Sequence, residues 1–303
     1  MLSVLKRPVK AMFERVLAIG AERAVKELGK RGATLVLAYH NIVPDRSRRG
    51  GDTSLHLGFD VFRRQLDLLQ RCTRVVALDD MVGDEVLATS QDDRPHVAIS
   101  FDDAYADALA VALPELAMRD LPATVFVAPG LLGTTSTWWD SYLGTAPDEA
   151  DSRRNYALNT LAGDAAAIAA YALSRGWIAS AGAVIASEAE LARAAMLRGI
   201  TFGAHSMTHP NLARLDLGTL KWELATSLEW LRARFSIFRP WIAYPYGLSN
   251  PEVERAAEQA GYLAGFRVEG AWTTRCRSTF ARTRLNVPAG VSDRGFLLRL
   301  AAR

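Results

Sequence analysis

Two short motifs in this sequence carry residue types that bind a catalytic metal. Asp102 and Asp103 directly follow the apolar run Val97–Phe101, and His205 and His209 lie four residues apart. Adjacent carboxylates repel each other unless a cation neutralises one of them. On a helical turn, imidazoles at this spacing face the same way and can share a metal. One carboxylate and two imidazoles leave a coordination position for water, so we expect a catalytic divalent metal site with a second carboxylate free to act as base.

Other interpretations of these motifs remain open at this point. A zinc protease of the His-Glu-x-x-His type would need Glu directly after the first histidine, and Ser206 stands there instead. An Asp before a helix that begins at Ala104 would cap that helix, which explains one of the two carboxylates but not the other. Two histidines and one carboxylate also form the site of non-haem Fe(II) oxygenases, but those ligands usually lie on an antiparallel barrel.

A third motif, Ala243-Tyr244-Pro245-Tyr246-Gly247, follows the other two. Together, and in this order, the three motifs resemble those of the polysaccharide deacetylases (carbohydrate esterase family four, the NodB-homology fold), over about residues 34–290. The resemblance implies a distorted (β/α) barrel that removes an N-acetyl or N-formyl group from an amino sugar. It implies that Asp102 is the catalytic base and that the Tyr246 backbone N–H holds the oxyanion. It implies a metal, Zn²⁺ first and Co²⁺, Ni²⁺ or Fe²⁺ as alternatives, bound by Asp103, His205 and His209.

The sequence departs from the common pattern of this family at two catalytic positions. Many members carry a late general-acid histidine, but no histidine follows His209, so we expect His40 in the Tyr-His pair to protonate the leaving amine. Many members also place Arg two residues before the third-motif proline, where this chain has Ala243. We expect Arg284 to replace it, with Arg239 and Arg282 as weaker candidates. These departures keep open a catalytically silent glycan-binding module of the same fold. The other two histidines, His56 and His96, are expected on the surface.

The elements that must position these residues alternate between short apolar runs and helical stretches. Near-continuous apolar runs are typical of parallel strands covered on both faces, and the alternation favours a (β/α) barrel or a doubly wound sheet. The expected strands are Thr34–Tyr39, Val97–Phe101, Ala123–Val127, Ile200–Gly203, Trp241–Tyr244 and Leu263–Phe266, with a further one near Arg284. The expected helices are Phe59–Arg71, Ala104–Met118, Ser187–Arg198, Leu217–Phe235 and Pro251–Ala260. The candidate residues follow strand ends, where α/β barrels place their chemistry. Residues 137–186, which begin with Trp138-Trp139-Asp140, are interpreted as an insertion beside the site.

Charge and composition limit the partners of the chain. Its net charge is +3, and residues 1–31 hold eight Lys or Arg against three Glu, so the remainder is slightly acidic and indicates no nucleic-acid surface. The two cysteines, Cys72 and Cys276, suggest no disulfide framework. Residues 1–31 form a basic amphipathic extension that either contacts anionic membrane or packs on the catalytic domain, residues 32–303. We expect a cytoplasmic enzyme, peripheral on the inner face of the membrane, that acts on an envelope polysaccharide or glycolipid.

Overall fold

The structure, a computed structural model, describes residues 20–44, 51–83, 94–145, 147–268, 270–274 and 278–302. Among these residues, seven parallel strands form a closed barrel. Their order is β1 (Thr34–Tyr39), β10 (Arg282–Asn286), β9 (Ala264–Val268), β8 (Phe238–Ala243), β7 (Ile200–Ala204), β6 (Ala123–Val127) and β5 (His96–Phe101). The barrel closes because the first strand, β1, pairs with β10 on one side and with β5 on the other. The predicted (β/α) barrel is confirmed.

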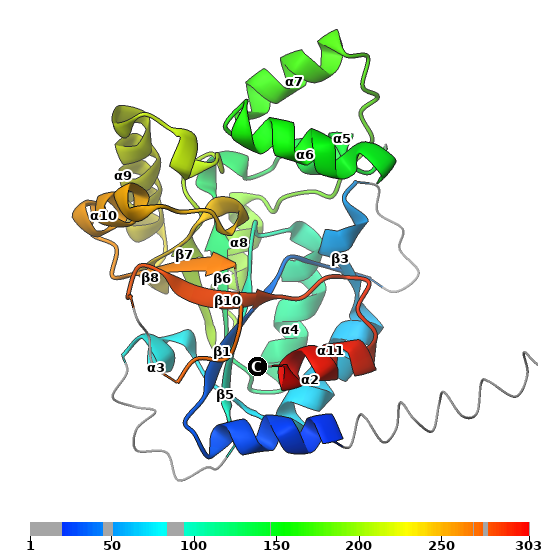
Figure 1. Cartoon of the computed structure of the whole chain (residues 1–303). Coiled ribbons are helices and arrows are strands. Elements are labelled where there is room, and N and C mark those ends of the chain that lie inside the picture. The colour runs from blue at the N-terminus through cyan, green and yellow to red at the C-terminus, as the bar shows by residue number, and fades with distance from the viewer. Residues whose placement is uncertain are drawn as a thin grey trace, which may run out of the picture.

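Short strands and helices complete the barrel. The two-residue β4 (Arg74–Val75) pairs with β5 on its outer side, and β2 (Asn41–Val43) pairs with β3 (His56–Gly58) beyond the end of β1. Helices surround the strands in Figure 1. Their bounds are α2 (Phe59–Cys72), α3 (Leu78–Val82), α4 (Leu113–Met118), α8 (Glu188–Ala194), α9 (Leu217–Arg234), α10 (Pro251–Ala260) and α11 (Asp293–Ala301).

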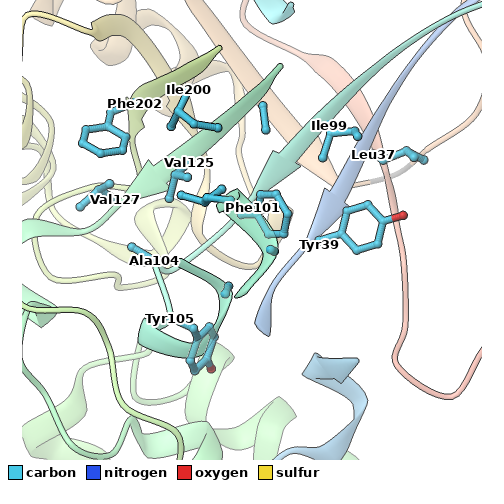
Figure 2. Packing of buried hydrophobic residues seen from close by; sticks show 14 of the residues in the cluster. Leu37, Tyr39, Ile99, Phe101, Ala104, Tyr105, Val125, Val127, Ile200 and Phe202 are labelled. Carbon is cyan, nitrogen blue, oxygen red and sulfur yellow. The ribbon is translucent and has the colours of Figure 1, made fainter. Parts of the chain in front are cut away.

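Strand alternation divides the core into an outer and an inner part. Successive side chains of a strand point to opposite faces, so every second residue of β1 and β5 packs outward against the helices. Leu37, Tyr39, Ile99 and Phe101 belong to this outer cluster, whose packing Figure 2 shows. The residues between them face the barrel interior, where a smaller cluster includes Val36, Ala98, Phe126, Trp241 and Phe266. Small side chains on several strands leave room in this interior for one large polar group.

The expected helix at Ala104 begins later than the sequence suggested. Asp103 and Ala104 have left-handed backbone, with φ of 68° and 56°, and Tyr105 makes an isolated bridge to Ile185. Helical structure begins only at residue 106, and a π-helical segment, Ala108–Ala112, leads into α4. Helix capping therefore does not account for either carboxylate. The left-handed backbone instead turns the Asp103 side chain away from that of Asp102.

Residues 137–186 contribute three helices at the end of the barrel where the candidate residues lie. They are α5 (Trp138–Tyr142), α6 (Ala150–Asn159) and α7 (Ala165–Ser174), drawn in green at the top of Figure 1. They have a small buried cluster of their own, which includes Trp138, Trp139 and Ile168. This cluster also contacts Tyr246, so the segment packs directly on the third motif.

The N-terminal extension is helical over 20–29 and packs on the domain. Ala21, Val25 and Leu28 are buried, and Glu22 forms a 2.8 Å ion pair with Arg71 of α2. The alternative of packing on the catalytic domain thus holds for this part of the extension. Residues 1–19 lie outside the described residues. Their sequence has apolar residues at helical spacing, which would form a stripe along a helix: Leu5, Val9, Met12, Val16 and Ile19. Within the described ranges, no helix combines the length and the apolar character needed to cross a membrane.

Candidate metal centre and active site

Asp103, His205 and His209 meet at one end of the barrel. Asp103 follows β5 and His205 follows β7, a strand separated from β5 only by β6. The Asp103 Oδ1 atom lies 3.5 Å from His205 Nε2 and 3.2 Å from His209 Nε2, and one ligand atom from each residue falls within 4.8 Å of the others. All three side chains are buried. This is the ligand set expected for a catalytic divalent metal, with two imidazole nitrogens and one carboxylate oxygen.

The hydrogen bonds of these residues fit a metal ion. His205 Nδ1 lies 2.7 Å from the Ala243 carbonyl oxygen, which can only accept, so Nδ1 carries the proton and Nε2 presents its lone pair to the site. The Asp103 Oδ1 atom is buried without a hydrogen-bond partner, although it faces both Nε2 atoms. A buried carboxylate oxygen is costly to leave unpaired, and a cation at this point would satisfy it.

Burial and charge set the protonation of the same residues. Burial lowers the pKa of His205 to about 4, so the imidazole is neutral and able to bind a metal near neutral pH. For Asp103, burial raises the pKa, but His209 and His205 lower it by more, and its pKa lies below the ordinary value. Both residues are therefore in the protonation states that metal ligation requires.

The two histidines do not lie on a helical turn as their spacing suggested. Residues 205–211 form a loop, in which Ser206 and His209 have left-handed φ of 60° and 64°. The Ser206 hydroxyl accepts the His209 backbone N–H at 3.1 Å. The loop brings the rings together with 4.6 Å between their centroids. The spacing thus places both imidazoles at one site, but through loop geometry rather than helical periodicity.

Asp102 is paired with Arg284 inside the barrel. Arg284 Nη1 donates to Asp102 Oδ1 at 2.6 Å and Nη2 donates to Oδ2 at 2.8 Å, a bidentate arrangement of two parallel hydrogen bonds. Burial raises the pKa of Asp102, but the Arg284 guanidinium and His205 lower it by more, so its pKa lies well below the usual range. Asp102 is therefore a carboxylate held in one orientation, with His205 Nε2 4.0 Å from its Oδ2.

Small interior residues make room for the fully buried Arg284 side chain. The guanidinium lies 5.0 Å from the centre of the Phe126 ring and donates to Ser100 Oγ at 3.1 Å, so it reaches from β10 across the barrel to β5 and β6. Gly203 is needed beside it, because a Cβ atom there would lie 2.5 Å from the Phe126 ring. Arg239 and Arg282, the weaker candidates, bond instead to residues of α3 and lie away from the site.

His40 and Tyr246 also lie at this end of the barrel. His40 is half-buried and follows β1, whose last residue, Tyr39, pairs with Phe101 and accepts the Asp102 backbone N–H at 2.9 Å, so His40 lies beside the start of the Asp102-Asp103 pair. Tyr246 has left-handed backbone with φ of 59° and donates its hydroxyl to the His209 carbonyl at 3.1 Å. The structure thus brings all seven predicted site residues to one end of the barrel, while their chemical roles stay predictions.

Sequence reasoning missed a buried polar network beside the site. Asp140 is fully buried and accepts hydrogen bonds from His56 Nε2, from Tyr105 Oη and from the backbone N–H groups of Asp52 and Ala183. Tyr105 in turn accepts from the Trp139 indole at 2.8 Å. The Trp139 ring lies 4.7 Å from that of His209. The Trp-Trp-Asp triplet at the start of residues 137–186 was the only sequence signal for this network.

The expected surface positions of His56 and His96 were wrong. The His56 side chain is 4% exposed, because β3 pairs with β2 beneath residues 137–186 and Asn41 and Asp140 bind both of its ring nitrogens. His96 begins β5 and is buried between β1 and β4. Another missed residue is Glu223 of α9, whose buried carboxylate binds the loop between His205 and His209.

Comparisons with known proteins find similarity in sequence and in fold. The family model described as polysaccharide deacetylase matches residues 89–265, more than half of the chain. A Bacillus subtilis (strain 168) protein named as a polysaccharide deacetylase, YxkH, is 31% identical over 98 residues; the match covers 32% of this chain and only about a third, 35%, of that relative.

Two solved structures share the fold over most of both chains. IcaB from Ammonifex degensii has a TM-score of 0.62 and 18% identity, with 89% of this chain and 98% of that one covered. The Streptococcus pyogenes deacetylase PplD, in complex with acetate, has a TM-score of 0.60 and 17% identity, with 88% and 98% covered.

Proposed function

Because the chain belongs to the polysaccharide deacetylase family, we propose that it is a metal-dependent hydrolase that removes an N-acetyl or N-formyl group from an amino sugar of an envelope polysaccharide or glycolipid. The observation that carries this proposal is the buried cluster of Asp103, His205 and His209 beside an ionised Asp102. Asp103 and the two histidines would hold the metal, with zinc the first choice for two nitrogen ligands and one oxygen ligand. Bound there, the metal would supply Lewis acidity toward water and the amide carbonyl.

The protein's own residues would divide the proton transfers between them. Asp102 takes a proton from the attacking water, whose oxygen forms the new bond to the acyl carbon. Arg284 keeps Asp102 ionised and oriented for this step. The Tyr246 backbone N–H stabilises the oxyanion that develops on the carbonyl oxygen. His40 delivers a proton to the nitrogen as the carbon–nitrogen bond breaks, so that the products are a free carboxylic acid and an amine.

The rival functions have less support. A catalytically silent module was suggested by the absent arginine of the third motif, but Arg284 occupies the corresponding role through its bidentate contact with Asp102. A non-haem Fe(II) oxygenase would carry its two histidines and carboxylate on an antiparallel barrel, whereas every pairing of the described barrel strands is parallel. The fold and the ionised base therefore favour hydrolysis.

Metal content and acyl release test the proposal together. Elemental analysis of the purified protein is expected to find one divalent metal per chain, and His205→Ala is expected to lose it. Incubation with N-acetylglucosamine oligomers, peptidoglycan and lipid-linked amino sugars should release acetate or formate from one of these substrates. Full metal occupancy in the variant would rule out this ligand set. Absence of acyl release from every substrate by the metal-loaded protein would favour the silent module.

Comparison of amide and ester substrates tests the role of His40. An alkoxide leaves more easily than an amine anion, so a general acid matters less for an ester. His40→Ala should retain the metal and lower kcat on the amide by roughly 10²–10⁴-fold. On an ester of the same acyl group the loss should be much smaller. Equal losses on both substrates would assign His40 to substrate binding or to structure.

A further inference from the structure

Glu223 is a buried carboxylate bound to the loop that carries the metal ligands. It lies on α9 with 2% of its surface exposed. Its Oε2 accepts the backbone N–H groups of Met207 and Thr208, both at 2.8 Å, and its Oε1 accepts the Thr208 hydroxyl. All three donors belong to the residues between His205 and His209. A buried carboxylate is costly unless it is fully hydrogen-bonded, and here the donors that satisfy it all come from one loop.

The loop is in a conformation that it would not adopt alone. Ser206 and His209 both have left-handed backbone, which is unfavourable for a residue with a side chain because Cβ approaches the following carbonyl oxygen. Such a conformation persists only where the surroundings determine it. Two further contacts fix the same loop: the Gly130 N–H donates to the Met207 carbonyl at 2.8 Å, and the Tyr246 hydroxyl donates to the His209 carbonyl. Glu223 supplies three of the loop's bonds to the rest of the domain from a single side chain.

Helix α9 makes Glu223 a rigid point of attachment. Asp216 caps its first turn by accepting the Gly218 and Thr219 N–H groups, and Leu220, Leu224 and Leu228 bury its inner face against the barrel. A helix with buried neighbours on both sides of Glu223 cannot shift to follow the loop. The Glu223 carboxylate therefore holds the backbone between the two histidines in a fixed position relative to α9.

We propose that Glu223 is a positioning residue that sets the metal affinity of the site by holding the 206–209 loop. The inference rests on the proposed metal site but concerns a residue that touches neither metal nor substrate. Supporting groups around metal ligands change metal affinity by roughly 10–100-fold when they are removed. Without support, the ligand side chains must become ordered when the metal binds. The entropy lost in that ordering makes the binding free energy less favourable.

Two substitutions of Glu223 separate position from charge. Glu223→Leu is similar in size and removes every acceptor, so the loop loses three hydrogen bonds. Glu223→Gln keeps them: its amide oxygen can accept both backbone N–H groups, and its NH₂ can donate to the Thr208 hydroxyl, which can act as acceptor. If position is what matters, Gln should rescue what Leu loses. Thr208→Val offers a milder test, because it deletes one hydrogen bond and leaves α9 unchanged.

The experiment measures zinc affinity of the full chain by competition with a chelator. Glu223→Leu should bind zinc roughly 10–100-fold more weakly, Thr208→Val more weakly in the same direction, and Glu223→Gln within a few-fold of wild type. Saturating zinc should restore most of the kcat of the Leu variant. The matched control is Ser227→Ala, which removes a buried 2.7 Å hydrogen bond that the same helix makes to Tyr262 rather than to the loop. It should lower Tm without changing zinc affinity, and Glu229→Gln on the exposed face should change neither.

The outcomes are distinct from those of the proposed function. Wild-type zinc affinity in folded Glu223→Leu, or in Thr208→Val where the Leu variant does not fold, would overturn the inference. An equal loss in Gln and Leu variants would also overturn it, since charge rather than loop position would then set the affinity. If wild type binds no zinc and His205→Ala changes nothing, the metal site itself fails.

Discussion

Asp102 and Asp103 are adjacent in the chain but have entirely different partners. Asp102 continues the inward-facing alternation of β5 and reaches Arg284 within the barrel. Asp103 has left-handed backbone, which turns its carboxylate toward His205 and His209. The Arg284 guanidinium keeps Asp102 ionised and occupies both of its oxygens, so neither is free to bind a cation. Asp103 instead presents an unpaired oxygen to the two histidines. The left-handed turn at Asp103 and Ala104 thus separates the predicted base from the predicted metal ligand.

Replacement of Asp102 tests this separation. Asp102→Asn should keep the metal and abolish turnover, because an amide cannot accept the water's proton. It should also destabilise the fold by about 3–5 kcal/mol, since Arg284 is left buried without its counter-ion. The double variant Asp102→Asn/Arg284→Met removes the buried charge and should recover part of that stability, still without activity. Urea unfolding, elemental analysis and acyl release measure the three properties.

The comparison requires the single variant Arg284→Met as well. If the stability losses of Asp102→Asn and Arg284→Met simply add in the double variant, the two side chains are not energetically coupled. Activity close to wild type in Asp102→Asn would mean that another group is the base.

Asp102 also predicts a dependence of stability on acid. Its pKa in the folded protein lies below the value of about 3.9 for an unfolded chain, so ionised Asp102 stabilises the fold above that pH. As pH falls below about 4, the unfolded state takes up the proton first and the stabilisation is progressively lost. Urea unfolding of the metal-free protein between neutral pH and pH 3 should show a steeper decline for wild type than for Asp102→Asn/Arg284→Met. Parallel curves would contradict the assignment.

Sequence was most informative about residues whose chemistry is unusual. Adjacent carboxylates and paired histidines predicted that Asp103, His205 and His209 lie together. The family resemblance and the place of Arg284 on a late strand predicted its contact with Asp102. Glu223 and Asp140 could not be found this way, because a Glu within an amphipathic helix and an Asp beside two Trp residues are ordinary in isolation. Both carboxylates are bound by donors from loops distant in the sequence, so no local sequence pattern indicates these contacts.

At the scale of elements, Asp140 fixes α5 to the barrel. Its carboxylate accepts from Tyr105 after β5 and from His56 of β3, and the neighbouring Trp139 ring lies against His209. The Asp52 side chain adds a second link, through an ion pair with Arg154 of α6. Residues 137–186 are thus bonded to the end of the barrel from two sides, which favours a fixed wall of the site over a lid that opens.

Asp140→Asn should loosen this attachment. Either orientation of the amide directs an N–H group toward a donor, because both carboxylate oxygens accept a backbone N–H. A buried donor without a partner costs about 1–3 kcal/mol. Hydrogen exchange should show reduced amide protection in residues 138–143 and 52–57 compared with wild type. Asp164→Ala is the control, since it removes only the cap of α7 and should loosen that helix alone. Unchanged exchange at 138–143 in Asp140→Asn would show that the network is dispensable.

Sequence predicted long elements better than short ones. Five of the six strand ranges expected from the sequence agree with the structure within about two residues, because buried parallel strands are apolar throughout. The exception is β8, which begins earlier, at Phe238, where Arg239 and Pro240 interrupt the apolar run. The strands β2, β3 and β4 have two or three residues each, too few for any periodicity to show. The helix after Ala104 starts late because Asp103 and Ala104 have left-handed backbone. Neither residue is glycine, so the sequence did not indicate that conformation.

At the scale of the molecule, the N-terminal extension has two parts. Residues 20–29 belong to the folded body, since Ala21 and Val25 lie in its main core. Residues 1–19 carry four Lys or Arg against one Glu. We predict that these residues hold the protein on anionic membrane, by charge and by the apolar stripe from Leu5 to Ile19. Deletion of 1–19 should abolish salt-sensitive sedimentation with anionic vesicles while Tm and acyl release persist. Equal sedimentation after deletion of 1–19 would contradict the prediction. Deletion of all of 1–31 is unsuitable, because loss of the buried residues Ala21 and Val25 would also destabilise the fold.

The barrel is closed where its first strand, β1, pairs with its last, β10. During synthesis, the parts of the site therefore become available in a fixed order. The three predicted metal ligands, and Glu223 that binds their loop, have all been made by the end of α9. Arg284, the partner of Asp102, lies on β10, which docks beside β1 only after β8 and β9 have been made. Pairing of segments so distant in sequence is a slow, late event in folding. On the proposed mechanism, Asp102 would therefore be oriented last, and hydrolysis would begin only when the barrel has closed.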